Sequence, residues 1–453
     1  MFPITSKTLK QRLLVSSGWT VAGYGLSQVI RFGSNLLMTR LLVPEMFGVM
    51  AIATMIMYGL AMFSDLGLGQ SIVRSKRGGE ADFLNTAWAI QILRGALLWG
   101  VALGFSLIIV LANRMGMVPP GSVYAEPSLP YVVGVLAASA FISGFASTKL
   151  HEASRILALG RITQIELIAQ LAGLLCMIGW AAFERSIWSL VAGSICSTLV
   201  STRLSHVWLP GVSNRWRWDH AALREIVHFG KWIFVSSILG FFVNSGDRLI
   251  LGGLLSTATL GVYVIAFFIF SAIESGMTKI IADVSFPALS EIARERPHDL
   301  KSRYYRLQVV IGAGACFFFG LLIVSGQVLI DLLYDRRYSE AGWMLEILAV
   351  ALLVAPAHVA TQCFLALGMP RLVSILAAIR LGMLFLMTPV GFHFFGLAGA
   401  LWAIVLSYIS YVPVTLFYKV KHGLFDLKRE LLPLPVVLAG VLVGAAFNWV
   451  VRL

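Results

Sequence analysis

Apolar stretches, each about as long as a membrane-spanning helix, dominate the chain. A helix needs about 20 residues to cross the hydrocarbon layer of a bilayer. Lipid offers no hydrogen bonds, so a spanning segment must satisfy its own backbone, as a helix does. We therefore expect an all-α integral membrane protein with about 12–14 transmembrane helices. The expected spans are 14–38, 46–68, 84–112, 130–148, 163–183, 187–207, 229–253, 258–281, 307–333, 342–367, 371–391, 396–418 and 432–451.

Composition excludes a soluble protein of this length. Hydrophobic residues make up 58% of the 453 residues and charged residues only 13%, whereas soluble domains carry about 25% charged residues. Lys7, Lys10 and Arg12 precede the first apolar stretch, as in a signal peptide. That stretch continues past Met38 without a small-residue cleavage site, so we expect a retained span.

The basic residues predict an orientation. The net charge is +13, but the basic residues are scattered between apolar stretches and form no basic domain, which argues against a nucleic-acid partner. With the N-terminus inside, 24 of the 35 lysines and arginines fall in inner segments and six in outer segments. This bias follows the positive-inside rule and predicts a cytoplasmic N-terminus.

The chain repeats itself at a long offset. LLVPEMFGVMAIA at 41–53 and LLSTATLGVYVIA at 254–266 match at six of thirteen positions, 213 residues apart. LALGR at 157–161 similarly resembles LALG at 365–368, which is followed by Arg371. Six spans separate the copies, so we expect two parallel six-helix halves. The expected divisions are 1–207, a cytoplasmic linker at 208–228, a second bundle at 229–418, and a basic loop with an extra span at 419–453.

Two inner segments, 208–228 and 282–306, are basic and have an amphipathic pattern. Such segments are typical of helices that lie on anionic lipid. A docking site for a cytoplasmic partner is the alternative interpretation.

Four arginines inside the expected spans are the proposed substrate contacts: Arg31, Arg94, Arg248 and Arg380. A charge near the bilayer centre costs about 2.5–3.5 kcal/mol on insertion scales, so it usually faces a cavity or a partner. A guanidinium binds phosphate oxygens through two parallel hydrogen bonds and stays charged. Several arginines around one cavity therefore suit a pyrophosphate, and ion pairing between helices is the competing explanation.

The remaining embedded charges are candidates for ion coupling or for ion pairs: Asp65, Asp247, Glu274, Lys279 and His358. Glu274 would couple transport to protons if it titrates, or would act as a permanent ion-pair partner. For residues near span ends, such as Asp65 and Lys279, we expect a structural role, because their side chains can reach the membrane–water interface. The sequence predicts no catalytic residue, no metal site and no cofactor, apart from coupling to protons or sodium.

Several segments resemble those of a known transporter family. They are MTRLLVPEMFG at 38–48, FSDLGLGQSIV at 63–73, NTAW at 85–88, and DRLILG at 247–252 followed by LGVY at 260–263. They resemble the Wzx-type oligosaccharide flippases of the polysaccharide-transport family. The resemblance covers the first twelve spans and implies the V-shaped fold of the multidrug/oligosaccharidyl-lipid/polysaccharide exporter superfamily. Members often have fourteen spans, so the C-terminal topology departs from the pattern.

The resemblance also implies a function and a location. An inner-membrane protein of this family moves an undecaprenyl-pyrophosphate-linked oligosaccharide from the cytoplasmic to the periplasmic leaflet, for lipopolysaccharide or exopolysaccharide biosynthesis. Membrane lipid, a polysaccharide polymerase and glycosyltransferases are the expected partners. A drug exporter of the same superfamily is the nearest alternative, although the embedded arginines oppose cationic drugs. A membrane polymerase is the alternative from another class, but the longest outer loop, 113–129, has Glu126 as its only acid.

Overall fold

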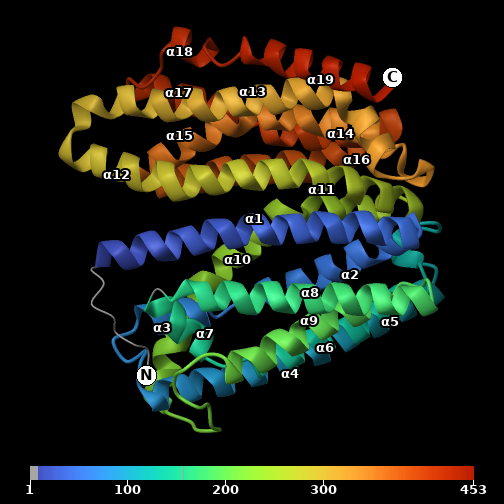
Figure 1. Cartoon of the computed structure of the whole chain (residues 1–453), viewed down its shortest axis with the longest axis vertical. Helices are drawn as coiled ribbons and strands as arrows, with labels where there is room; N and C mark the ends of the chain where they lie inside the picture. The colour runs from blue at the N-terminus through green and yellow to red at the C-terminus, as the bar shows by residue number, and fades with distance from the viewer. Residues whose placement is uncertain (1–8, 157, 453) are drawn as a thin grey trace. The chain divides into compact units, whose positions relative to one another are not determined.

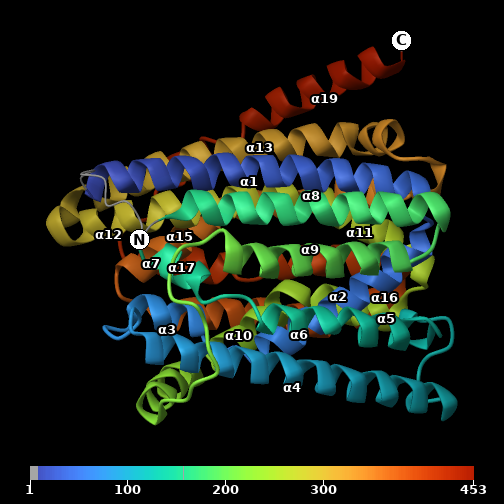
Figure 2. The ribbon, with the colours of Figure 1, turned by 60° about the horizontal axis from the view of Figure 1, so that its bottom comes forward.

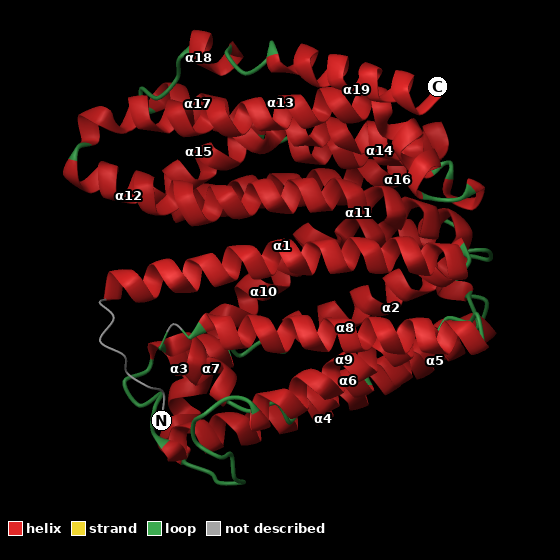
Figure 3. Ribbon diagram, viewed as in Figure 1, coloured by secondary structure: helices red, strands yellow, loops and turns green. Residues whose placement is uncertain are grey.

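The computed structural model describes residues 9–156 and 158–452 (Figure 1). Within these ranges the chain is helices and loops, with no strand (Figure 3). Leu157, in one of the expected repeat segments, and Lys7 lie outside the described residues. The chain divides into two compact units, one ending at Phe242 and including Leu255–Ala258, the other comprising Val243–Leu254 and the residues from Thr259 onward.

The first unit is an antiparallel helical bundle. Its α8 packs between α1 and α9, and α4 packs along α5 and α6 (Figure 2). Glycines allow the close approach of α8 and α9, because a Cβ at Gly173 would lie 2.8 Å from the Gly193 carbonyl oxygen. The helices are α1 (Leu9–Leu41), α2 (Pro44–Met62), α3 (Leu68–Arg74), α4 (Ala81–Arg114), α5 (Leu129–Leu136), α6 (Ala138–Gly144), α7 (Lys149–Arg155), α8 (Leu159–Phe183), α9 (Trp188–Val207) and α10 (His220–Leu254), which crosses into the second unit.

The second unit is built around α13, which packs against α14, α15 and α19. A π-helical turn, Ile281–Ser285, precedes α12, and a short 3-10 segment, Val350–Val354, joins α14 to α15. Its helices are α11 (Thr257–Ile280), α12 (Phe286–Glu295), α13 (Leu300–Leu333), α14 (Ala341–Ala349), α15 (Ala355–Ala366), α16 (Pro370–Ile409), α17 (Val412–Lys421), α18 (Leu427–Leu431) and α19 (Val436–Arg452).

The 40-residue helix α16 is a hairpin and not one rod. Gly396 adopts a left-handed conformation with φ of 60°, which a glycine adopts without strain. The chain folds back there, and Gly391 on one limb packs directly against Gly399 on the other. This turn separates the two spans expected at 371–391 and 396–418.

Eight helices or helical stretches among the described residues are long and apolar enough to cross a membrane. The number becomes nine if the bent pair Leu129–Gly144 and Lys149–Arg155 forms one span. The protein is thus a multi-pass membrane protein. Three further helices, α1, α9 and α10, coincide with expected spans and have 33, 20 and 35 residues. The stretch Pro370–Lys421 counts once among the eight although it contains the bend at Gly396, so it covers two of the expected spans.

Helix boundaries recur at the offset of the sequence repeat. Helices α1 and α10 end at Leu41 and Leu254, which are 213 residues apart. Helices α2 and α11 begin at Pro44 and Thr257, again 213 residues apart. In both copies of the repeat, one helix ends and the next begins at equivalent positions. The repeat is therefore present in the structure as well as in the sequence.

The structure corrects one of the two expected amphipathic helices. Residues 208–219 contain no helix, and α10 begins only at His220. Hydrogen bonds hold this segment extended along the start of α4, from Arg215 N–H to Asn85 (2.9 Å) and from Asp219 N–H to Thr86 (2.9 Å). The Arg77 guanidinium binds the Asp219 carboxylate at 2.7 Å and holds its pKa below the usual range. The other expected segment does contain an amphipathic helix, α12.

The C-terminal helix α19 docks onto α13 through small residues. Gly440 and Gly444, spaced four apart, face the α13 backbone so closely that a Cβ at Gly440 would overlap the Phe317 carbonyl oxygen. The Asn448 side chain donates to the Val324 carbonyl at 2.8 Å. Small residues at this spacing allow tight helix packing in lipid.

Replacing Gly440 with leucine should destabilise the protein by about 1–3 kcal/mol, because the side chain has no room against the α13 backbone. The measurement is the melting temperature of the purified protein in detergent. Gly382→Leu is the matched control, since nothing lies within 4 Å of a Cβ at Gly382. Equal melting temperatures for the two variants would contradict the packing described.

Candidate functional site

Helices α10, α11 and the two limbs of α16 carry most of the predicted residues of this half, which gather in one polar cluster. Tyr408, 8% exposed, lies near its centre. Arg380, Glu274, Asp247 and Arg248 are all near enough to contribute to the electrostatic environment of its hydroxyl. We call the set Asp247, Arg248, Glu274, Arg380 and Tyr408 the Tyr408 cluster. The sequence placed its four charged members on three separate helices, and the structure brings them together.

Aromatic rings orient the two arginines of the cluster. The Arg380 guanidinium lies 3.8 Å from the centre of the Tyr408 ring, and Arg248 lies 4.6 Å from the centre of the Phe267 ring. Stacking uses the face of a guanidinium and leaves its N–H groups at the edge. The Arg380 Nε is buried and has no hydrogen-bond partner among the residues that the structure describes, so this donor remains for an anion.

The two carboxylates of the cluster differ in their partners. Asp247 is 6% exposed and accepts a 2.5 Å hydrogen bond from the Tyr263 hydroxyl. Glu274 is half-buried, and its one acceptor contact among the described residues is with the Thr278 hydroxyl, one turn along α11, at 3.2 Å. With two arginines and two carboxylates, the cluster carries both signs of charge.

His358 lies beside the cluster. Its ring stacks on Tyr411, with centroids 6.1 Å apart and an angle of 10° between the planes. Arg380 acts electrostatically on the imidazole. Lys279, by contrast, occupies the last turn of α11, where a cation interacts favourably with the helix dipole.

Arg94 in the first unit binds the end of a helix. Its Nη2 donates to the Ala61 carbonyl at 2.7 Å and its Nε to the Ser64 hydroxyl at 2.9 Å, in the last turn of α2 and just beyond it. Gln91, one turn earlier on α4, donates to three carbonyls at the end of α6, including Ala146 at 3.0 Å. Helix α4 therefore supplies the donors for two interrupted helices, which is a structural role for Arg94.

A pocket of about 750 Å³ lies beside these interrupted helices, entirely within the first unit. Arg94, Asp65 and His151 are among its polar lining residues. Asp65 accepts from the Gly67 N–H at 2.9 Å and from the Ser237 hydroxyl at 3.3 Å, and so fixes the link between α2 and α3. Sequence reasoning did not identify His151 or Gln91, because a single polar residue in an apolar stretch gives no signal of its neighbours.

Arg31 is not among the residues that line the pocket beside α2 and α6. It is exposed on α1, and it forms no ion pair or hydrogen bond with any described residue. The other three predicted arginines each contact a carbonyl group or an aromatic ring, whereas Arg31 has no such contact with a described residue.

Removing the Arg94 side chain should destabilise the protein, because hydrogen bonds to a charged group contribute about 1.5–3 kcal/mol. We expect Arg94→Ala to lower the melting temperature in detergent, and Arg31→Ala to leave it unchanged. A melting temperature for Arg94→Ala equal to that of the unaltered protein would exclude the structural role.

The fold is shared with solved transporters. The inward closed conformation of the lipid II flippase MurJ superposes with a TM-score of 0.65 at 12% identity, covering 96% of this chain and 93% of MurJ. The inward-facing conformation of a multidrug resistance MATE family transporter of the MOP superfamily gives a TM-score of 0.62 at 16% identity, covering 95% of each chain. The chain therefore has the helical exporter fold of that superfamily.

Sequence comparison then shows the family. Residues 37–342 match the family described as polysaccharide biosynthesis protein, and the chain belongs to it. The lipopolysaccharide biosynthesis protein WzxC of Escherichia coli strain K12 is 21% identical over 355 residues, covering 76% of this chain and 67% of WzxC. The probable low-salt glycan biosynthesis flippase Agl15 of Haloferax volcanii is 25% identical over 239 residues, covering 50% of this chain and 47% of Agl15. The chain thus spans about two thirds of WzxC and about half of Agl15, and these names agree with the transporter class expected.

Proposed function

We propose that the chain is a flippase that moves an undecaprenyl-pyrophosphate-linked oligosaccharide across the membrane by alternating access. The direction is from the cytoplasmic to the periplasmic leaflet, and the product serves surface or exopolysaccharide biosynthesis. The family, the exporter fold and relatives named as flippases support this proposal. The distribution of basic residues supports an inner-membrane protein with its N-terminus in the cytoplasm.

The unpartnered Arg31 is the observation that carries the proposal. An exposed guanidinium in hydrocarbon would cost about 2.5–3.5 kcal/mol, and none of its described neighbours offsets this cost. If Arg31 instead faces a water-filled path that receives a pyrophosphate, the guanidinium stays hydrated or paired and this cost does not arise. Helix α1 is also one of the more polar long helices, as is its repeat partner α10, and Asn244, 213 residues after Arg31, is likewise exposed.

The Tyr408 cluster supplies the second part of the proposal. Arg248 and Arg380 present edge donors while their faces stack on rings, and so suit bidentate contacts with phosphate oxygens. Asp247 and Glu274 balance these charges when no substrate is bound. Approach of a pyrophosphate would then displace a weakly held carboxylate, and Glu274 is the less tightly bound of the two.

Alanine at Arg31, Arg248 or Arg380 should slow flipping by roughly 10- to 100-fold, as expected from the loss of a charge-assisted hydrogen bond. The measurement is the transfer of a fluorescent polyprenyl-pyrophosphate oligosaccharide in proteoliposomes. Arg114→Ala, at the outer end of α4, is the matched control. Normal rates in all three variants would reject the assignment of these residues.

The same proteoliposomes separate the flippase from a drug exporter. The fold resemblance to a multidrug transporter favours this second function, and a cationic drug would pair with Asp247 or Glu274. A protein inert toward lipid-linked sugars but active on a cationic dye would overturn the flippase proposal. Polymerase and glycosyltransferases of the same pathway are the proposed partners.

Proton coupling should depend on Glu274. We expect an imposed pH gradient to accelerate flipping by the unaltered protein, and Glu274→Gln to remove the acceleration while retaining a basal rate, because glutamine cannot titrate. Replacing the pH gradient with a sodium gradient distinguishes the two coupling ions. An acceleration that persists in Glu274→Gln would place the coupling elsewhere.

A further inference from the structure

A basic pocket of about 830 Å³ lies in the first unit, and none of the proposed substrate contacts lines it. One wall is the end of α3 and the loop after it, which carries Arg74 and Lys76. The other wall is the first turns of α10, which carry Arg224 and His228. Its single acidic lining residue is Glu225.

The cations of this pocket are not neutralised by the protein. Among the described residues, Arg74, Lys76 and Arg224 form no ion pair. Their neighbours behave differently, because Arg77 binds both Glu80 and Asp219, and Arg217 binds Asp82. Carboxylates are therefore common in this part of the chain, but Glu225 is the one carboxylate among the lining residues, against three cations. A permanent charge of about +2 remains there for a ligand to balance.

Arg74 is oriented for an anion. Its guanidinium lies over the Phe229 ring, 4.8 Å from the centre. Stacking fixes the plane of the group and leaves the N–H donors at its edge, which match two oxygens of one phosphate. No described residue accepts from these donors.

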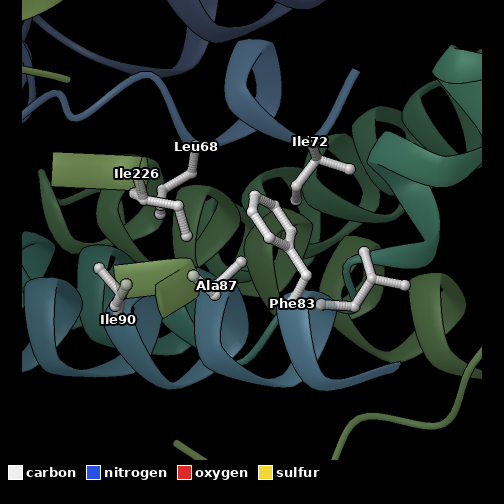
Figure 4. Close-up of a cluster of buried hydrophobic side chains, with 8 residues drawn as sticks. Leu68, Ile72, Phe83, Ala87, Ile90 and Ile226 are labelled. Atoms are coloured by element: carbon white, nitrogen blue, oxygen red, sulfur yellow. The ribbon is translucent and has the colours of Figure 1, made fainter. Parts of the chain in front are cut away.

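The helices that carry the two walls pack on a shared apolar cluster. Leu68 and Ile72 of α3, Phe83 and Ala87 of α4, and Ile226 of α10 belong to one buried apolar cluster (Figure 4). Helix α10 also approaches the backbone before α3 closely, since a Cβ at Gly230 would lie 2.7 Å from the Leu66 carbonyl oxygen. This packing holds the two basic walls in place, so a ligand need not order them.

The surroundings of the pocket indicate a membrane ligand. Helix α10 has 35 residues, about 52 Å at 1.5 Å per residue, whereas the hydrocarbon layer is about 30 Å thick. Its first turns therefore reach the head groups on the basic side of the membrane. Trp216 and Trp218 immediately before α10 are 62% and 40% exposed, as in interfacial aromatic belts. Val73 and Val227, each next to a basic lining residue, are exposed apolar side chains suited to acyl chains.

We propose that this pocket binds the phosphate head group of an anionic phospholipid in the leaflet on the basic side. Arg74 and Arg224 contact the phosphate from opposite walls, and Lys76 adds a third cation. Basic pockets at the cytoplasmic ends of helices are typical sites for such lipids. The second unit contains a basic-side pocket of a different kind, in which Glu291, Glu295 and Asp299 accompany three arginines. That pocket has no excess charge and serves as an internal comparison.

Native mass spectrometry of the purified full-length protein tests the proposal without any transport assay, so its outcome is separate from that of the flippase proposal. Phosphatidylglycerol is titrated against phosphatidylcholine as the zwitterionic lipid. The double variant Arg74→Gln with Arg224→Gln should bind phosphatidylglycerol roughly tenfold more weakly or worse. The matched control, Arg303→Gln with Arg306→Gln, removes the same charge from the balanced pocket and should bind as the unaltered protein does.

Three results would overturn the proposal. The first is equal affinity of the double variant and the control for phosphatidylglycerol. The second is an affinity of the unaltered protein for phosphatidylcholine equal to its affinity for phosphatidylglycerol. Inorganic phosphate at millimolar concentration could displace the lipid, which would identify the pocket as a site for a soluble anion. If the double variant has a lower melting temperature than the unaltered protein, the single variant Lys76→Gln, at an exposed loop position, replaces it. Phosphatidylglycerol binding by Lys76→Gln with unchanged affinity and unchanged salt dependence would also contradict the proposal.

Discussion

The absence of hydrogen-bonding solvent in the bilayer is the constraint on which the rest of this structure depends. Every interruption of a helix exposes carbonyl groups that lipid cannot satisfy. In the first unit, α2 and α6 both end where side chains of α4 supply the missing donors: Arg94 for the first and Gln91 for the second. The interrupted helices and the intramembrane charge therefore explain each other, and together they border a polar pocket.

The division into helices was largely predictable from the sequence, because the length and apolar character of a span depend only on the residues within it. The repeat was predictable for the same reason, and the helix starts at Pro44 and Thr257 confirm its offset. The extended conformation of 208–219 was not, because it depends on hydrogen bonds to Asn85 and Thr86, more than a hundred residues away. An amphipathic pattern cannot reveal a distant partner that competes with the helix.

The candidate site was predictable only in part. Charge in an apolar stretch is a strong signal, and it identified all four charged members of the Tyr408 cluster. Their aromatic neighbours gave no such signal, since tyrosine and phenylalanine are common in membrane helices, and so the stacking of Arg380 and Arg248 was missed. The helix-end role of Arg94 was missed because a free carbonyl has no sequence pattern.

The glycine turn of α16 has a consequence for membrane insertion. Arg380 lies on the first limb of this hairpin and Tyr408, its stacking partner, on the second. A lone segment that carries this arginine would enter hydrocarbon with its charge uncovered. The hairpin joined at Gly396 keeps both limbs adjacent in the chain, so Tyr408 can cover the guanidinium as soon as the second limb follows the first. The turn thus links the biogenesis of this part of the protein to the geometry of its charged cluster.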